Sequence, residues 1–370
     1  SSPLEVTAPL ADAGKIAQTK DYIDKSKRPL LIVGSQAMSE TSETNNLAAA
    51  IQSLGIPTFL GGMARGLLGQ HNDVQFRHKR TQALKAADLV IVVGFPFDFR
   101  LGYGKSINPK AKVMAVNRSP FDLRKTRRPT LGIRADGSHF LQQLAQATGG
   151  AGGPWGTWFD KLRKNENDRE AQIATQAQVP ASEYINPLLV CQSLEKHMSQ
   201  NAIMVVDGGD FVATASYIVR PRKPLSWLDP GVFGTLGVGG GFALGASQAR
   251  PDSEIWIIYG DGSAGYSLME FDTFVRHKIP VIAIVGTDAS WAQIAREQID
   301  VLKDDVGTTL LRTDYHLVAE GLGGKGLLLS KAEETDSTIK KAKELAKQGH
   351  PVLVNVQIGS TDFRKGSISI

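Results

Sequence analysis

Two aspartates in the second half of the chain have the residue type and spacing of a metal site. Asp261 stands in a Gly-Asp-Gly sequence after the apolar run 254–259, and Asp288 follows the apolar run 280–286. They are 288 − 261 = 27 positions apart, as a strand end, a helix and a returning strand require. Two carboxylates at one edge of a parallel sheet need a cation or a proton between them. The sequence therefore predicts a hard cation held beside a diphosphate.

Strand and helix patterns alternate along the whole chain, which predicts parallel sheets covered on both faces. The clearest break in composition is the glycine-rich stretch 147–156. We therefore expect an α/β protein with two doubly wound domains. The expected parts are a linker at 1–14, a first domain at 15–148, a second linker at 149–156 and a second domain at 157–370.

The composition excludes several classes of protein. The chain has 370 residues and a net charge of +5, and its basic cluster at 118–134 lacks the interleaved aromatic residues typical of nucleic-acid binding. We interpret this cluster mainly as a solvated face. The single cysteine, Cys191, excludes an internal disulfide and is compatible with an intracellular location, and no apolar run is long enough to span a membrane. We interpret His71 and His78 as surface or core histidines without ligand-rich neighbours.

Three segments resemble, in order, those of a known family. The sequences DGGDF at 207–211, FGTLGVGGGFALGA at 233–246 and the stretch from Gly-Asp-Gly to 293 resemble the thiamine diphosphate (ThDP) enzymes of the acetolactate synthase and 2-hydroxyacyl-CoA lyase group. The resemblance implies that Mg²⁺ is bound by the side chains of Asp261 and Asp288 and by the carbonyl of Ser290. Thr287 and Asp288 stand where the family has two asparagines, which adds one negative charge to the site.

The same resemblance implies which residues contact ThDP. Leu236 would be the apolar wedge that bends the cofactor, and the Gly234 carbonyl would accept its 4′-amino group. Trp291 and Gln293 are the candidates for contacts to substrate. Close packing of helix on sheet is an alternative explanation for the glycines at 239–241. The implied cofactor-binding residues are Gly209, Asp210, Phe211, Gly234, Leu236, Gly262 and Ser263.

The first domain resembles the middle domain of the family, which holds FAD in acetolactate synthases and ADP or CoA in the acyl-CoA enzymes. The segment 94–104 is similar to the flavin segment, but Pro96 stands at its first arginine position. Asn117 and Ser119 stand in place of two aspartates. Both departures disfavour FAD, and we expect either ADP or CoA, with Arg100 and Asn117 as candidate ligands, or an empty structural domain.

The resemblance implies a lyase that cleaves a 2-hydroxyacyl-CoA to an aldehyde and formyl-CoA, as in fatty acid α-oxidation. The alternatives are an acetolactate synthase-like carboligase acting on 2-keto acids and a non-catalytic nucleotide-binding subunit. A homodimer or homotetramer is implied as well. The endoplasmic reticulum is the implied location, with cytoplasm, mitochondrion and peroxisome as alternatives.

One domain of the family has no counterpart in these residues. Nothing before Lys15 suffices for the pyrimidine-binding domain, which carries the glutamate that protonates the cofactor ring. Of three explanations, we favour a fragment of a longer chain, then a subunit completed by a separate partner chain, and then a chain that has lost catalysis. The 370 residues alone are predicted to be inactive.

Overall fold

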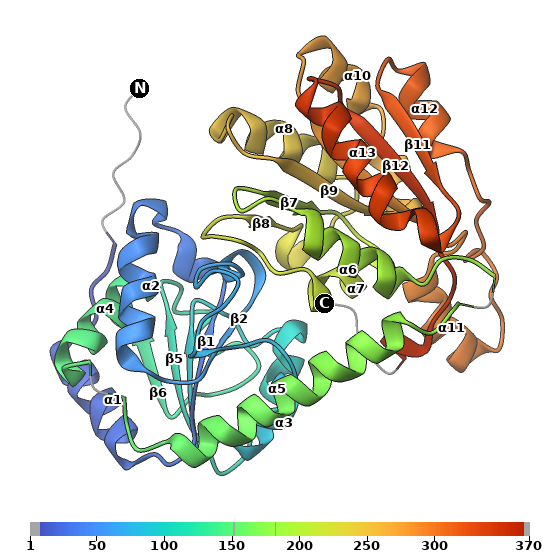
Figure 1. Cartoon of the computed structure of the whole chain (residues 1–370). Helices are drawn as coiled ribbons and strands as arrows, with labels where there is room; N and C mark the ends of the chain where they lie inside the picture. Colours follow the sequence, from blue (N-terminus) through green and yellow to red (C-terminus); the bar gives the residue numbers. More distant parts are fainter. Residues whose placement is uncertain (1–7, 151, 182, 366–370) are drawn as a thin grey trace. The chain divides into compact units, whose positions relative to one another are not determined.

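The computed structural model describes residues 8–150, 152–181 and 183–365, and the chain divides into two compact units between Glu170 and Ala171 (Figure 1). Each unit contains one six-stranded sheet whose strand pairs are parallel. The predicted fold class, two α/β domains with doubly wound sheets, is confirmed. Residues 1–7 and 151 of the expected linkers lie outside the described residues, and the expected domain bounds stay a prediction.

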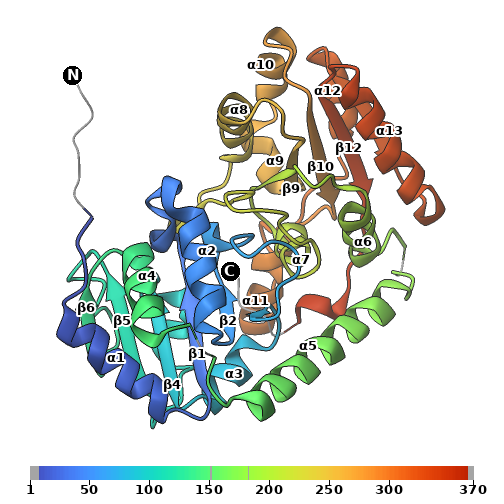
Figure 2. The ribbon, with the colours of Figure 1, turned by 60° about the vertical axis from the view of Figure 1, so that its left-hand side comes forward.

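The first unit alternates strands and helices. Its elements are α1 (Ala13–Lys25), β1 (Pro29–Val33), α2 (Thr44–Leu54), β2 (Thr58–Leu60), β3 (Gln75–Phe76), α3 (Arg80–Ala86), β4 (Leu89–Val93), β5 (Lys112–Asn117), β6 (Leu131–Arg134), α4 (Gly137–Thr148) and the start of α5 (Gly156–Ala177). The strand order β3-β2-β1-β4-β5-β6 is that of doubly wound nucleotide-binding folds. Helix α4 packs against both α1 and α2 (Figure 2).

The central strands of this unit are apolar at every position. Every residue of β1 and β4 is buried, and the two strands pair from Pro29 with Leu89 to Val33 with Val93. A parallel strand covered by helices on both faces has no solvent side, so it needs apolar side chains throughout. This explains why short apolar runs, and not alternating patterns, marked the strands in the sequence.

The second unit repeats the alternation and contains the predicted cofactor segments. Its elements are the end of α5, α6 (Pro187–His197), β7 (Ile203–Val206), α7 (Asp210–Ile218), β8 (Trp227–Leu228), α8 (Gly239–Ala249), β9 (Ile255–Gly260), α9 (Asp261–Ser267), α10 (Glu270–Arg276), β10 (Val281–Thr287), α11 (Ala292–Leu302), α12 (Tyr315–Gly321), β11 (Lys325–Leu329), α13 (Thr335–Lys347) and β12 (Val352–Gln357). The strand order is β11-β12-β10-β9-β7-β8.

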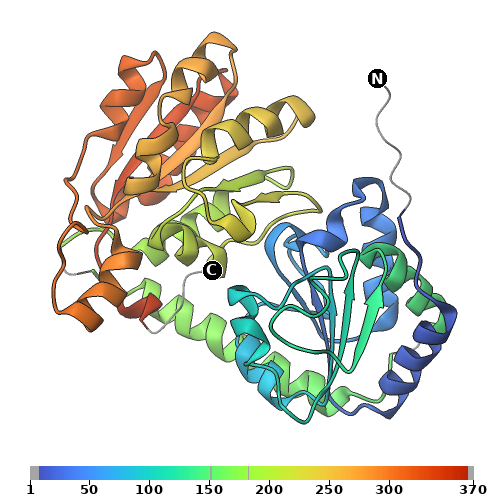
Figure 3. The ribbon, with the colours of Figure 1, turned by 180° about the vertical axis from the view of Figure 1, so that it is seen from behind.

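The two faces of the second sheet pack against different helices, because successive side chains of a strand point to opposite faces. Met204 and Val206 of β7 lie in the apolar cluster formed with α6, α7 and α13. Ile203 and Val205 lie in the cluster formed with α8, α9, α10 and α12, whose side of the sheet is seen in Figure 3. Because helices pack on both faces of the sheet, the ends of its strands hold their side chains in defined positions.

One expected element differs from the structure. The sequence favours a turn at Gly-Asp-Gly and one helix over 266–278, whereas the structure has α9 starting at Asp261 and a separate helix, α10. The two glycines suggested a turn, but Gly260 is the N-cap and the residues after it adopt helical geometry. Asp261 is consequently the first residue of a helix.

Candidate cofactor site

Three neighbouring strands of the second sheet, β10, β9 and β7, end at the same edge. Since β8 lies on one side of β7 and β9 on the other, the chain order switches there, which is where doubly wound folds bind ligands. A cavity of about 220 Å³ lies at this edge. Its lining combines the predicted metal, cofactor and substrate residues Gly209, Asp210, Phe211, Gly234, Leu236, Asp261, Gly262, Ser263, Asp288, Ser290, Trp291 and Gln293 with Gly260, Gly286, Ala292 and Ile294.

Asp261 is buried and ties the end of β9 to the loop after β10. Its Oδ1 accepts the N–H of Gly262 at 2.8 Å, and its Oδ2 accepts the N–H of Ala289 at 2.7 Å. Burial raises the pKa of Asp261, and these backbone N–H groups oppose the rise. The Gly262 N–H is thus already engaged by Asp261. The hydroxyl of Ser263 shares its one hydrogen between the carbonyls of Gly208 and Gly260, which lie 2.9 and 3.0 Å from Oγ.

Asp288 lies in a strained loop beside Asp261. Its Oδ1 accepts the N–H of Ser290 at 3.1 Å. Ala289, between them, has a φ of 58°, a left-handed conformation that costs a residue with a Cβ about 1–2 kcal/mol. This conformation turns the loop so that its N–H groups reach both carboxylates. Burial and then the charge of Asp261 raise the pKa of Asp288 to about 8.

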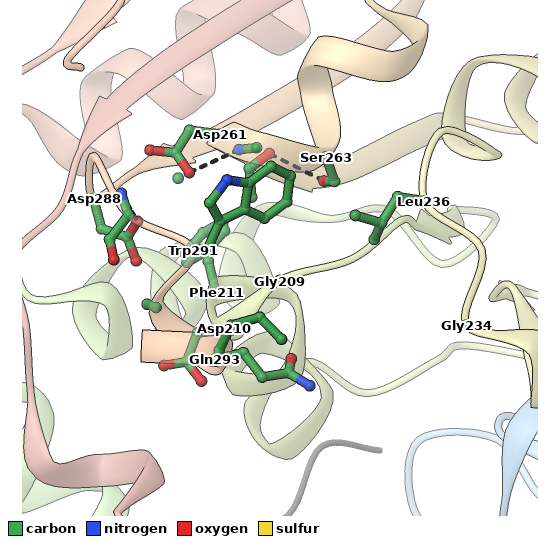
Figure 4. Close-up of a pocket in the computed structure, with 16 residues that line it drawn as sticks. Gly209, Asp210, Phe211, Gly234, Leu236, Asp261, Ser263, Asp288, Trp291 and Gln293 are labelled. Carbon is green, nitrogen blue, oxygen red and sulfur yellow. Dashed lines mark hydrogen bonds between the residues drawn. The ribbon is translucent and has the colours of Figure 1, made fainter. Parts of the chain in front are cut away.

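The donor set suits a hard divalent cation. Two buried carboxylates that repel one another are stabilised by a cation between them, and carboxylate and carbonyl oxygens are the ligands that Mg²⁺ prefers. Asp261, Asp288 and Ser290 line the same cavity, and Figure 4 shows the two aspartates on one side of it. Thr287, by contrast, is buried in the sheet, where its hydroxyl hydrogen-bonds Oδ1 of Asn355 at 2.6 Å. Of the two departures from the asparagine pair, only Asp288 lines the cavity.

The N-terminus of α7 forms another wall. Gly209, its N-cap, has φ 110° and ψ 172°, a region that is essentially restricted to glycine. The first N–H groups of a helix lack intrahelical partners and attract anions. Asp210 would repel a diphosphate, but it forms an ion pair with Arg296 of α11, and Nε of Arg364 lies 3.7 Å from the same carboxylate oxygen. These two arginines offset the charge of Asp210, and the sequence did not point to either.

The glycine-rich loop between β8 and α8 supplies the side of the cavity opposite the aspartates. Gly234 and Leu236 line it, and Figure 4 shows Leu236 across the pocket from Asp261. Asp207, another residue that the sequence did not single out, accepts hydrogen bonds from the N–H of Gly237 in this loop and from the N–H of Gly239, the first residue of α8. The sequence signal that could have pointed to Asp207 was its place at the end of a buried strand, upstream of a glycine-rich loop.

Trp291 and Gln293 lie where α11 begins. A Cβ built on Gly262 would lie 2.5 Å from the ring of Trp291, so the ring packs directly on the backbone of α9. Helix α11 has no buried side chain among its residues, and Ile294 is 56% exposed. The Arg296–Asp210 ion pair fastens this helix to α7.

The candidate nucleotide residues of the first unit are engaged locally. Nη2 of Arg100 lies 2.7 Å from Oδ2 of Asp98, and its guanidinium lies 4.8 Å from the centre of the Phe95 ring. Asn117 hydrogen-bonds the side chain of Gln36 and accepts the N–H of Ser119 at 2.9 Å. Binding of ADP, CoA or FAD by this unit stays a prediction.

The expectation that His78 has no ligand-rich neighbours was wrong. His78, Glu166 and Glu170 bring ligand atoms within 4.8 Å of one another, because α5 returns along β3. Glu166 accepts the N–H groups of Arg77 and His78 at 3.1 and 2.8 Å, and Nη1 of Arg77 lies 3.6 Å from Glu170. Each carboxylate therefore has a donor or cation already, which explains the cluster as an anchor for α5.

Comparison with known families identifies the domain that contains the cavity. Residues 16–144 match the thiamine pyrophosphate enzyme central domain, and residues 207–356 match the thiamine pyrophosphate enzyme C-terminal TPP binding domain. Thiamine pyrophosphate (TPP) is another name for ThDP. The chain belongs to the thiamine pyrophosphate enzymes. Every residue that lines the cavity falls within the second match, so the cavity lies in a ThDP-binding domain, as the resemblance implied.

Curated relatives match along the whole chain. Proteins named 2-hydroxyacyl-CoA lyase 2 from Mus musculus and Danio rerio are 46% and 47% identical over 375 residues. These alignments cover 100% of this chain and 59% and 60% of the relatives. A probable acetolactate synthase from Mycobacterium bovis is 30% identical, over 94% of this chain and 62% of the relative. The chain thus spans about three fifths of the relatives it matches. Among the described residues, no helix combines the length and apolar character that crossing a membrane requires.

Proposed function

We propose that this chain supplies the Mg²⁺- and diphosphate-binding part of a ThDP-dependent lyase that cleaves a 2-hydroxyacyl-CoA to an aldehyde and formyl-CoA. The observation that carries the metal-diphosphate site is the pairing of Asp261 and Asp288 in a cavity walled by the N-terminus of α7. The proposal for the reaction and its substrate is supported by the relatives named 2-hydroxyacyl-CoA lyase 2.

Bound ThDP would supply an electron sink for cleavage of a carbon–carbon bond beside a carbonyl carbon. In this proposal Asp261, Asp288 and the Ser290 carbonyl hold Mg²⁺ against the diphosphate. The N-terminus of α7 stabilises the diphosphate charge, while Leu236 and Gly234 hold the other end of the cofactor. Trp291 and Gln293 face the substrate and exclude water from the reacting atoms.

An acetolactate synthase-like carboligase is the second candidate, supported by the relative that is 30% identical. Both reactions need the same metal-diphosphate site, so the residues described here are compatible with either. They differ in the substrate, which is an acyl-CoA for the lyase and a 2-keto acid for the synthase. A third candidate, a non-catalytic nucleotide-binding subunit, needs no functional metal site.

Activity is proposed for the complete protein and not for these residues alone. The relatives extend beyond the matched part, and the glutamate that contacts the cofactor ring is expected in a pyrimidine-binding domain. We further propose a homodimer or homotetramer, a location in the endoplasmic reticulum, and an adenine nucleotide or CoA in the first unit.

Calorimetry tests the cofactor site. Titrating Mg²⁺ and ThDP into the complete protein should give saturable binding that Asp261→Ala abolishes. Asp252→Ala, which removes an exposed carboxylate from the loop before β9, is the matched control and should bind normally. Failure of the unchanged protein to bind would contradict the proposal and favour the non-catalytic subunit.

Product analysis separates the lyase from the synthase. Incubation of the complete protein with a 2-hydroxyacyl-CoA should release formyl-CoA and an aldehyde one carbon shorter, both detected by mass spectrometry. Incubation with pyruvate should give no condensation product. Efficient condensation of the keto acid, without formyl-CoA release from the thioester, would establish the second candidate instead.

A further inference from the structure

Asp207 is a buried carboxylate at the end of β7 that no predicted contact to the cofactor or metal uses. It is 2% exposed. Its Oδ1 accepts the N–H of Gly237 at 2.9 Å, and its Oδ2 accepts the N–H of Gly239 at 2.7 Å. The two oxygens therefore engage the end of the glycine-rich loop and the first residue of α8, 30 and 32 positions further along the chain.

The space around this carboxylate is filled. A Cβ on Gly239 would lie 2.9 Å from Oδ2 of Asp207 and 2.8 Å from the ring of Tyr259. The hydroxyl of Tyr259 hydrogen-bonds Ser267 at 3.0 Å, and the same Ser267 hydroxyl accepts the N–H of Gly240 at 3.3 Å. The start of α8 is thus held on two sides by hydrogen bonds, and the loop before it has little freedom to shift.

The held loop is a wall of the cofactor cavity. Leu236 and Gly234 line the cavity, and Leu236 directly precedes Gly237, whose N–H Asp207 accepts. Leu236 also lies against the turn that follows Asp207, since a Cβ on Gly208 would be 2.1 Å from its Cδ2. The same carboxylate therefore connects the turn that leads into α7 with the loop on the opposite side of the cavity.

We propose that Asp207 is a positioning residue that fixes the distance between these two walls and so holds Leu236 and Gly234 against bound ThDP. This role rests on the proposed ThDP function, which it deepens. Hydrogen bonds from two N–H groups to a buried carboxylate are among the stronger ones in proteins, because one partner is charged. Burial raises the pKa of Asp207, and the N–H groups of Gly237 and Gly239 oppose the rise.

Asp207→Asn is the variant that tests the role, because it keeps the shape of the side chain. An amide offers one oxygen in place of two, so one of the two loop N–H groups faces an NH₂ donor. Asp136→Asn is the matched control, since Asp136 is likewise a buried carboxylate at the start of a helix, α4, and lies in the first unit.

Two measurements on the complete protein separate positioning from a merely structural role. The first is hydrogen exchange without cofactor, in which Asp207→Asn should speed exchange at Gly237 or Gly239 at least tenfold and leave β9 and β10 unchanged. The second is turnover at saturating ThDP, measured well below the melting temperature. There kcat should fall at least tenfold while the KM for substrate changes less than threefold, and Asp136→Asn should leave kcat unchanged.

Unchanged exchange at both glycines, or a kcat within twofold of the unchanged protein, overturns the proposal. If Asp207→Asn does not fold, Asp207→Glu is measured in the same way, because it keeps both acceptors but pushes the loop outward by one methylene. Absence of ThDP binding by the unchanged protein would contradict both the proposed function and this role of Asp207. Faster exchange would in that case still establish the contact between Asp207 and the loop.

Discussion

Adding one methyl group at Gly208 should damage the cofactor site with little effect on folding. A Cβ there would lie 2.1 Å from Cδ2 of Leu236, whereas carbon atoms in contact lie about 3.5 Å apart or more. The Leu236 methyl must therefore move by about 1.4 Å in Gly208→Ala. Because that methyl is the end of a rotatable side chain, the cost is about 0.5–1.5 kcal/mol. A displacement of about 1 Å in a positioning group can lower turnover by about 100-fold.

We therefore expect Gly208→Ala to lower kcat by about 10- to 100-fold and the melting temperature by only about 2–4 °C. The assay is steady-state turnover of the complete protein at saturating ThDP, beside thermal unfolding followed by circular dichroism. Gly265→Ala on α9 is the matched control, since a Cβ there has nothing within 4 Å. A folded, ThDP-saturated Gly208→Ala protein with turnover within twofold of the unchanged protein would refute the link between Leu236 and catalysis.

Three further predictions concern single positions. Asp261→Ala should abolish ThDP-dependent binding of Mg²⁺ in calorimetry while the circular dichroism spectrum stays unchanged, and retained binding would contradict its assignment as a ligand. Gly209→Ala should lower the free energy of unfolding by about 1–3 kcal/mol, because alanine cannot adopt its backbone conformation without strain, and chemical denaturation measures this loss. The third prediction concerns Asp136. Burial acts to raise the pKa of Asp136, but hydrogen bonds from His139 and Arg118 outweigh burial and hold this pKa below its usual value. The ionised Asp136 therefore stabilises the protein above the pKa of the unfolded chain, about 4, and this stabilisation is lost as pH falls through the lower pKa of the folded protein. Asp136→Asn should lower the free energy of unfolding by about 1–3 kcal/mol at pH 7, and the difference between the two proteins should disappear in acid.

The fold could be predicted from the sequence because it depends on local patterns, whereas most residues that line the cavity were named from the resemblance to the family and only Asp261 and Asp288 from their own spacing. Buried parallel strands appear as unbroken apolar runs, and the ends of three such strands carry the glycines and aspartates that line the cavity. The partners of these residues could not be predicted. Asp207 and Gly237 are 30 positions apart, and Asp210 and Arg296 are 86 apart, so their contacts arise only when the sheet brings the segments together. The helical start at Asp261 was missed because glycines on either side of it favour a turn.

The lack of buried side chains in helix α11 affects how the second unit unfolds. None of its side chains is buried, and the ion pair that fastens it, Arg296 with Asp210, contributes on the order of 1 kcal/mol. Segments with so few buried contacts open in local excursions far cheaper than global unfolding. Trypsin should therefore cut within or at the end of α11, after Arg296 or after its exposed C-cap Lys303, while β9 and β10 stay intact. Opening of α11 would then remove one wall of the cavity while the sheet that supports it stays folded.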